Sequence, residues 1–169
     1  TLVYVAKNGV YEGCLVLRDQ LKEDAKEAVD TLHKEGKKCI IVSGDNQEIT
    51  SSIGLQLGVD QAIGGCMPED KVNTVKKYME EGMTAFVGDG VNDAPVITLA
   101  NVGIAMGALG SDAAIEAADV VLMDDSVSKI SLAIAASKRI LFVANENIYG
   151  AIAIKVLTLI FGALGIANM

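Results

Sequence analysis

The sequence Gly88-Asp89-Gly90-Val91-Asn92-Asp93-Ala94-Pro95 carries most of the information about the fold. It follows Thr84–Val87, a short apolar run that we predict to be a β-strand. Asp89 and Asp93 stand among glycines, which permit tight turns and close approach of a ligand. Two carboxylates at the end of a strand offer the hard oxygen atoms that Mg²⁺ prefers. We therefore expect a loop that binds Mg²⁺ and phosphate, with Asp89 and Asp93 as the metal ligands.

Around this loop, short apolar runs alternate with amphipathic stretches. Leu2–Ala6 and Val10–Leu17 flank Asn8-Gly9, which is typical of a two-residue β-hairpin turn. Beyond the hairpin we expect strands at Cys39–Val42, Thr84–Val87, Val102–Met106 and Val120–Met123, and helices at Lys22–Glu35, Gln47–Leu57, Glu69–Glu81 and Asp112–Ala117. This alternation predicts an α/β fold: a parallel, Rossmann-like sheet with helices on both faces.

Two further loops carry candidate functional residues, because open parallel sheets bind ligands at the carboxyl ends of their strands. Ser43 offers a hydroxyl, Gly44 a backbone amide and Asp45 a carboxylate, just before a helix whose N-terminus favours anions. Taken alone, these residues are equally typical of an ordinary turn. Lys71 lies in the first turn of a helix, where the helix dipole disfavours a cation. A bound phosphate would explain Lys71; a solvated surface lysine is the alternative.

Composition excludes several classes of protein. The 169 residues include 14 Lys and Arg against 22 Asp and Glu, a formal net charge of −8, which argues against a nucleic-acid partner. A hydrophobic fraction of 51% excludes a disordered chain. Cys14, Cys39 and Cys66 lie far apart without a C-x-x-C motif, so neither a disulfide framework nor a zinc finger is indicated. We expect all three to be small buried residues of a protein in a reducing compartment.

The C-terminal part of the sequence has the composition of a membrane helix. Ile148–Met169 is almost wholly apolar and, at about 1.5 Å per residue, can cross a hydrocarbon layer of about 30 Å. Lys138-Arg139 precede it and would mark the cytoplasmic side. A buried core helix is the alternative. Because the chain begins at Thr1 and ends within this hydrophobic stretch, we expect it to be a piece of a longer protein.

The three loops together resemble the P-type ATPases, which are members of the haloacid-dehalogenase-like phosphotransferases. Ser43-Gly44-Asp45-Asn46, Pro68-Glu69-Asp70-Lys71 and Gly88 to Pro95 occur in the order and rough spacing of that family. Asn101–Gly107 and Ala117–Leu122 are similar to its heavy-metal branch. The resemblance covers essentially the whole chain, and it implies a haloacid-dehalogenase-like fold followed by a long helix that enters the membrane.

This resemblance also implies a function: ATP-driven transport of a heavy-metal cation through an aspartyl-phosphate, with Mg²⁺ and ATP as cofactors. Ser43 stands where the family usually has threonine, and it keeps the hydroxyl that contacts the phosphoryl group. The resemblance implies that Ser43 and Gly44 contact the phosphoryl group and that Asp45 lies beside the nucleotide. Lys71 would neutralise the acyl phosphate, and Asp89 would bind Mg²⁺. Asn92 and Asp93 would complete and orient the phosphate loop.

One family motif is absent. The phosphorylated aspartate belongs to Asp-Lys-Thr-Gly-Thr, which this sequence lacks. Asp70–Thr74 mimics the motif, but it does not follow an apolar strand, lacks the glycine and already supplies the motif lysine. We expect the nucleophile and the nucleotide-binding domain upstream of Thr1, and the actuator domain also outside this chain. The fragment alone is then expected to be inactive.

The residues around Lys155 narrow the expected cargo. Ile154–Leu159 resembles pumps of the zinc, cadmium and lead type, in which a lysine here pairs with an aspartate of the following helix. Lys155 is therefore a candidate transport residue, and extension of its amine to the membrane interface is the alternative. Asn147 and Tyr149 keep a copper-type pump open, because that type has an Asn- and Tyr-rich pattern here.

Three regions are expected. Residues 1–127 would form the C-terminal part of the phosphorylation domain, residues 128–147 a stalk helix, and residues 148–169 a truncated transmembrane helix. Residues 1–147 would be cytoplasmic, in a multi-pass protein of the plasma membrane. Two other functions remain as alternatives: a soluble haloacid-dehalogenase-like phosphatase, and a non-catalytic fragment that binds phosphate and Mg²⁺.

Overall fold

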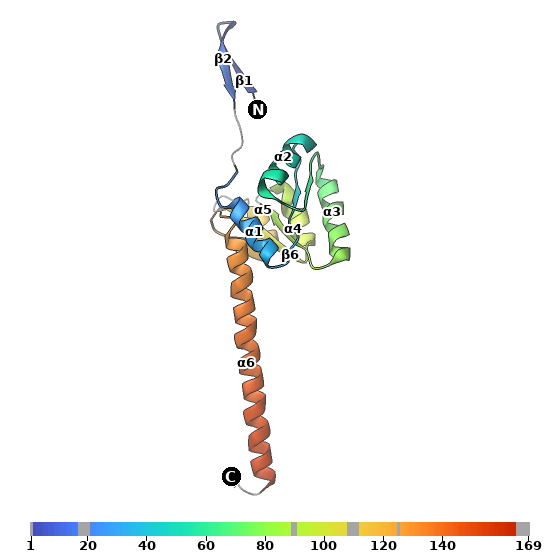
Figure 1. Cartoon of the computed structure of the whole chain (residues 1–169), viewed down its shortest axis with the longest axis vertical. Coiled ribbons are helices and arrows are strands. Elements are labelled where there is room, and N and C mark those ends of the chain that lie inside the picture. The colour runs from blue at the N-terminus through green and yellow to red at the C-terminus, as the bar shows by residue number, and fades with distance from the viewer. Residues whose placement is uncertain (1, 17–20, 89–90, 108–111, 125, 165–169) are drawn as a thin grey trace. The chain divides into compact units, whose positions relative to one another are not determined.

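The computed structural model describes residues 2–16, 21–88, 91–107, 112–124 and 126–164 (Figure 1). The chain divides into two compact units, Thr1–Val127 and Ser128–Met169. In chain order the elements are β1 (Leu2–Lys7), β2 (Val10–Val16), α1 (Ala25–Lys34), β3 (Ile40–Val42), α2 (Gln47–Leu57), β4 (Gln61–Ile63), α3 (Pro68–Glu81), β5 (Ala85–Gly88), the 3₁₀ turn η1 (Val91–Asp93), α4 (Ala94–Leu99), β6 (Val102–Met106), α5 (Asp112–Ala117), β7 (Val120–Leu122) and α6 (Lys129–Ala163).

The predicted hairpin is confirmed. β1 and β2 pair antiparallel, and the turn residues Asn8 and Gly9 have φ angles of 52° and 80°. Positive φ at both central residues is what a type I′ turn requires, and Asn-Gly tolerates it best. The rings of Tyr4 and Tyr11 lie 6.4 Å apart on the paired strands, and both side chains are exposed.

The prediction of three buried cysteines is wrong. Cys14 is exposed, and Cys39 and Cys66 are only partly buried. Cys14 lies on β2, and a two-stranded hairpin has no second layer of structure against which to bury its side chains. Cys39 and Cys66 lie in loops just before β3 and just after β4, where the strands no longer cover them.

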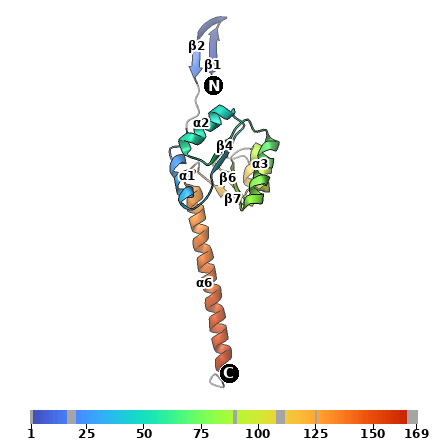
Figure 2. The same cartoon turned by 45° about the vertical axis from the view of Figure 1, so that its right-hand side comes forward.

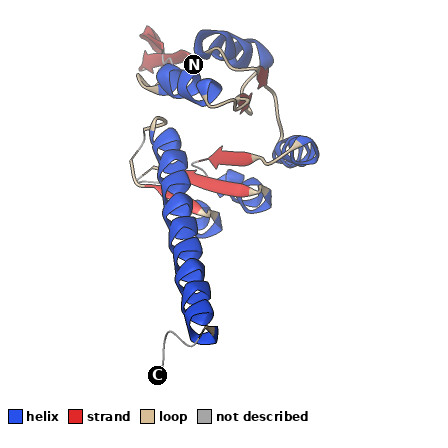
Figure 3. Ribbon diagram, turned by 60° about the horizontal axis from the view of Figure 1, so that its bottom comes forward, coloured by secondary structure: helices blue, strands red, loops and turns tan. Residues whose placement is uncertain are grey.

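Five short strands form two parallel sheets rather than one continuous sheet. β3 pairs with β4, and β5, β6 and β7 follow one another in the second sheet. Figure 2 brings β4, β6 and β7 into one view with α3, and Figure 3 separates the strands by colour from the helices. The predicted class, parallel strands alternating with helices, is confirmed. Along the chain, β3 and β4 are followed by α2 and α3, and β5, β6 and β7 are followed by η1, α5 and α6.

The core of the second sheet lies between α4, α5 and β6. Ile97 on α4, Ala105 on β6 and Ala114 on α5 are each at most 1% exposed and pack in one cluster. Small residues let the layers approach closely: a Cβ at Gly103 of β6 would collide with the carbonyl oxygen of Ile97. This core fixes α4, and with it the adjoining turn η1, which carries Asp93.

α6 is long and apolar. It runs from Lys129 to Ala163, and a window within it has a mean hydropathy of 1.5, with none of that window buried. By length and composition the helix can cross a membrane, as the sequence predicts. The predicted span extends to Met169, and residues 165–169 lie outside the described part of the chain.

Candidate functional site

The first predicted loop, Ser43-Gly44-Asp45, follows the carboxyl end of β3 and closes on itself. The Ser43 hydroxyl donates to Oδ2 of Asp45 at 3.1 Å and accepts from the Asp45 backbone N–H at 3.1 Å. α2 begins directly afterwards, capped by Asn46, whose side chain accepts from the Ile49 N–H at 2.8 Å. The loop therefore presents a hydroxyl and a carboxylate at the N-terminus of a helix, where an anion is favoured.

A connecting loop, residues 63–67, runs from β4 to α3 beside the Ser43 loop. The Ser43 N–H donates to the Ile63 carbonyl at 2.9 Å, and the Cys66 N–H donates to the Ser43 carbonyl at 3.0 Å. The Gly65 N–H donates to the Asp45 carbonyl. These main-chain bonds fix the position of Ser43 and Asp45 relative to the start of α3.

α3 carries Lys71 in its first turn. Pro68 occupies the start of the helix, a position suited to a residue without an N–H. Asp70 Oδ2 accepts from the Met67 backbone N–H at 2.9 Å, and the Lys71 N–H donates to the Met67 carbonyl at 3.2 Å. Met67, at the end of the connecting loop, therefore positions the first turn of α3, which carries Lys71.

Lys71 and Asp93 form the central contact of the candidate site. Lys71 Nζ lies 2.7 Å from Asp93 Oδ1, and the two side chains are 19% and 15% exposed. Asp93 comes from η1, after β5, while Lys71 comes from α3, after β4. The ion pair compensates the charge that the helix dipole disfavours at Lys71. It also joins two of the three predicted loops.

Gly88, the last residue of β5, leaves the space in which Asp93 lies. A Cβ at Gly88 would come within 2.9 Å of Asp93 Cβ and 3.0 Å of its Oδ2. Asn92 is exposed beside Asp93, with no hydrogen bond to its side chain among the described residues. Its amide is therefore open to a ligand.

Asp89, predicted as a metal ligand, lies outside the described residues. In the part of the chain that is described, no three His, Cys, Asp or Glu side chains gather into a set that could hold a metal ion. The ion pair with Lys71 is formed by Oδ1 of Asp93 and not by Oδ2. Mg²⁺ needs only one or two protein carboxylates, so Asp93 is a suitable ligand among the described residues, and the role of Asp89 stays a prediction.

The structure brings the predicted residues into two pairs, Ser43 with Asp45 and Lys71 with Asp93. No hydrogen bond between described side chains joins one pair directly to the other; the connecting loop links them through the main chain. Lys155 lies on α6, in the second unit, exposed and without an ion pair to any described residue. Its transport role stays a prediction.

Sequence reasoning missed Gln47 and Gly64, which shape the same loops. Gln47 bonds across to residues 62 and 64, and a Cβ at Gly64 would come within 2.7 Å of Gln47 Cα and of the buried Thr50 hydroxyl. Their partners lie far away in sequence, so no local pattern could have revealed them.

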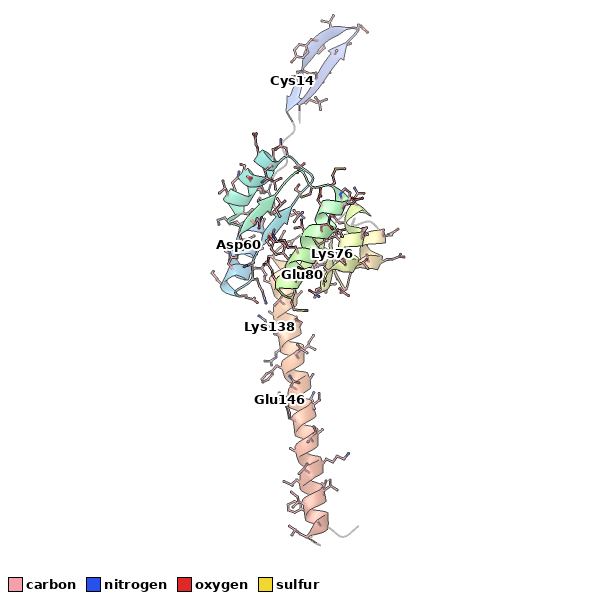
Figure 4. All side chains as sticks on the ribbon, turned by 90° about the vertical axis from the view of Figure 1, so that its right-hand side faces the viewer. Cys14, Asp60, Lys76, Glu80, Lys138 and Glu146 are labelled. Carbon is pink, nitrogen blue, oxygen red and sulfur yellow. The ribbon has the colours of Figure 1, made fainter. Side chains whose placement is uncertain are left out.

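A separate polar cluster occupies the opposite ends of β3 and β4. Asp60 Oδ2 accepts from the Cys39 N–H at 2.7 Å and lies 2.9 Å from His33 Nε2 (Asp60 is labelled in Figure 4). The bond from the Cys39 backbone, and then the one from His33, lower the pKa of Asp60. Burial, with Asp60 nearby, raises the pKa of the Cys39 thiol. This cluster precedes both strands, whereas the candidate site follows them.

Comparison with known proteins agrees with this geometry. A model of the haloacid dehalogenase-like hydrolase family matches residues 1–101, more than half of the 169 residues. The chain belongs to the haloacid dehalogenase-like hydrolases.

Individual relatives of this haloacid dehalogenase-like chain are metal-transporting ATPases. It is 42% identical to a zinc-transporting ATPase of Synechocystis over 100% of the chain and 24% of the relative. It is 43% identical to a cadmium, zinc and cobalt-transporting ATPase of Bacillus subtilis over 100% of the chain and 25% of the relative. The predicted resemblance to heavy-metal P-type ATPases is confirmed. The chain spans about a quarter of the length of these relatives.

A solved structure gives the same result. The crystal structure of a zinc-transporting PIB-type ATPase in the E2·Pi state matches 99% of this chain and 27% of its own, with a TM-score of 0.84 and 34% identity. The predicted haloacid-dehalogenase-like fold is therefore confirmed.

Proposed function

We propose that this chain is part of an ATP-driven transporter of a heavy-metal cation of the zinc, cadmium and lead type, which works through an aspartyl-phosphate. The observation that carries the proposal is the 2.7 Å ion pair between Lys71 and Asp93. It joins the loops after β4 and β5 in a chain whose relatives transport zinc and cadmium.

In this proposal Lys71 neutralises charge on the phosphoryl group and on the carboxylate that receives it. A half-buried ammonium placed in advance stabilises the developing charge more than water would. The contact with Asp93 holds the Lys71 side chain in one orientation. The receiving carboxylate is supplied from outside residues 1–169, because the motif that carries it is absent here.

Ser43 and Asp45 would bind the other side of the same group. The Ser43 hydroxyl and the amide of Gly44 are donors suited to phosphoryl oxygens, and Asp45 would lie beside the nucleotide. The open amide of Asn92 would complete the loop around the phosphoryl group. ATP is the proposed phosphoryl donor.

Mg²⁺, held by Asp89 and Asp93, would offset the negative charge of the phosphoryl oxygens when bound. Asp93, which pairs with Lys71 through Oδ1, would be one of the two residues that hold the cation. The ion pair with Lys71 would also orient Asp93 for such a role.

The remaining parts of the proposal concern the whole transporter. Residues 1–127 would belong to the phosphorylation domain, residues 128–147 to a stalk and residues 148–169 to a membrane helix. The nucleotide-binding and actuator domains would come from other parts of the same polypeptide. Residues 1–147 would lie in the cytoplasm, and the full protein would cross the plasma membrane several times. Lys155 would act on the transported cation.

The test is phosphorylation of the full-length protein with γ-³²P-labelled ATP. The wild type is expected to form an acid-stable, hydroxylamine-sensitive phosphoenzyme whose level responds to zinc or cadmium, and Asp89→Ala is expected to form none. If the phosphoenzyme level responds to copper(I) alone, the transporter is of the copper type and not of the zinc, cadmium and lead type. Undiminished labelling of Asp89→Ala would contradict the proposed metal ligand, and no labelling of the wild type would overturn the proposed function.

A further inference from the structure

Gln47, the first residue of α2, bonds across to the end of β4. Its Nε2 donates to the Ala62 carbonyl at 2.9 Å, and its Oε1 accepts from the Gly64 N–H at 2.7 Å. The side-chain amide thus pairs with a carbonyl and an N–H two residues apart, as a neighbouring strand would. Nε2 also lies 2.8 Å from the Ser51 hydroxyl, which orients the amide.

These bonds are not needed for the helix itself. Asn46 already caps α2 through the Ile49 N–H, and Thr50 donates to the Asn46 carbonyl at 3.0 Å. Gln47 reaches away from its own helix to a segment 15 to 17 residues further along the chain. The contact therefore has an effect on the loop after β4 rather than on the start of α2.

The segment that Gln47 holds is the beginning of the connecting loop, residues 63–67. The backbone N–H and the backbone carbonyl of Ser43 both bond to this loop. The loop ends at Met67, whose carbonyl accepts a hydrogen bond from the Lys71 N–H. Gly64 packs tightly against the start of α2. A Cβ at Gly64 would lie 2.7 to 2.9 Å from Gln47 Cα, the Thr50 hydroxyl and the Asn46 carbonyl. The Gln47 amide therefore adds a side-chain contact to the main-chain bonds that hold this loop between Ser43 and Lys71.

We propose that Gln47 is a positioning residue for phosphoryl transfer: it sets the relative placement of the Ser43 hydroxyl and the Lys71 ammonium through the connecting loop. This inference rests on the proposed function. It differs from a general stabilising role because it predicts an effect on the binding of a phosphoryl group in molecules that remain folded.

Gln56, on the same helix, offers a matched control. Among the described residues, its Nε2 bonds only to the Ser52 hydroxyl, at 3.4 Å, one turn away. Gln56→Leu makes the same chemical change as Gln47→Leu in the same helix without touching the connecting loop. Gln47→Glu is the graded variant, because it keeps the acceptor for the Gly64 N–H and loses the donor to Ala62.

The experiment uses the full-length protein and orthovanadate, which occupies a phosphoryl site as a five-coordinate mimic. The readouts are the vanadate concentration for half-inhibition of ATPase activity, the ATP concentration for half-maximal rate, and the melting temperature. We expect Gln47→Leu to weaken vanadate inhibition about tenfold or more, since small misplacements of positioned groups have large effects. The ATP concentration for half-maximal rate should stay near that of the wild type. In vanadate sensitivity, Gln47→Glu should fall between the wild type and Gln47→Leu.

Gln56→Leu is expected to match the wild type in all three readouts. If Gln47→Leu lowers only the melting temperature, with vanadate sensitivity equal to that of Gln56→Leu, the positioning role is overturned and Gln47 is only structural. If the wild type itself forms no phosphoenzyme from ATP, the proposed function fails and this inference fails with it. A wild-type phosphoenzyme combined with unchanged vanadate sensitivity of Gln47→Leu overturns the inference alone.

Discussion

Lys71 Nζ and Asp93 Oδ1 lie 2.7 Å apart although the two residues follow different strands. Both side chains are less than a fifth exposed, so water screens the pair only weakly. The ion pair holds the Lys71 ammonium in one position beside Asp93. Such preorganisation is what makes a fixed charge more effective than a mobile one.

Lys71→Met is expected to lower the rate of phosphoenzyme formation about 100-fold or more, by analogy with loss of one preorganised donor. It also leaves the half-buried Asp93 carboxylate without its cation, at a cost of about 1–3 kcal/mol in the free energy of unfolding. Lys76→Met is the matched control on α3, since Lys76 is exposed (Figure 4). Rapid-quench labelling and chemical denaturation measure the two effects. Equal labelling rates for the two variants would exclude a role of Lys71 in phosphoryl transfer.

Gly88→Ala is expected to displace Asp93, because the new Cβ would lie 2.9 Å from Asp93 Cβ. Overpacking of this kind costs about 1–3 kcal/mol, and it should also reduce labelling by breaking the Lys71 contact. Gly82→Ala serves as control: nothing lies within 4 Å of a Cβ there, and its φ of 165° is extended backbone. The measurement is the unfolding free energy of each variant together with its phosphoenzyme level. A Gly88→Ala variant as active and stable as Gly82→Ala would show that Asp93 can move freely.

Sequence patterns predicted the elements that carry their own local signal. The Asn8-Gly9 turn, α2 and β6 were placed correctly because turn chemistry or apolar periodicity marks each of them. β4 and α4 were not predicted. β4 has only three residues, and α4 contains Pro95 and β-branched residues within a single short helix. Both are fixed by packing: α2 covers β4, and α4 packs on β5 and β6.

The candidate site was predictable in part for the same reason. The motif loops identified Ser43, Lys71 and Asp93 as functional candidates. The ion pair between Lys71 and Asp93 was not predicted, because sequence order does not reveal which side chains two neighbouring loops bring into contact. Gln47 gave no signal for a similar reason, since Ala62 and Gly64, to which it bonds, lie 15 and 17 residues further along the chain.

Ile97→Ala should destabilise the first unit strongly. Ile97 is fully buried between Ala105 and Ala114, so truncation leaves a cavity and costs about 2–5 kcal/mol. Leu55→Ala, at a side chain that is 85% exposed, should change the unfolding free energy by less than about 0.5 kcal/mol. Urea denaturation compares the two. Similar midpoints would mean that the α4–α5–β6 cluster does not form the core.

Asp60 should make stability depend on acid pH. Bonds from the Cys39 N–H and from His33 hold the pKa of Asp60 below its ordinary value of 3.8. A carboxyl whose pKa is lower in the folded state stabilises the fold above its ordinary pKa, and this contribution is lost as pH falls through the folded value. Asp60→Asn should therefore melt at a lower temperature than the wild type at pH 6, with the difference shrinking below about pH 3.8.

Asp30→Asn is the control for this effect. Asp30 pairs with Lys26 at 3.4 Å on the exposed surface of α1, and exposed pairs of this kind contribute little. Its melting curve should follow that of the wild type across the whole pH range. A constant difference between Asp60→Asn and the wild type from pH 6 to pH 3 would mean that ionisation of Asp60 has no part in stability.

Lys155 should control the response to metal rather than the chemistry of phosphorylation. It lies on the apolar helix α6, where an unpaired ammonium in a membrane costs about 2.5–3.5 kcal/mol unless it is compensated. Lys155→Met should change the zinc or cadmium concentration for half-maximal ATPase activity about tenfold, a size typical of one charged contact, while labelling from inorganic phosphate persists. Lys155→Arg should retain part of the metal response, and Ile154→Ala, its neighbour, should retain all of it. Unchanged metal dependence of Lys155→Met would leave extension of the amine to the membrane interface as its role, because a side chain that only reaches water can be replaced by an apolar one without affecting the cation.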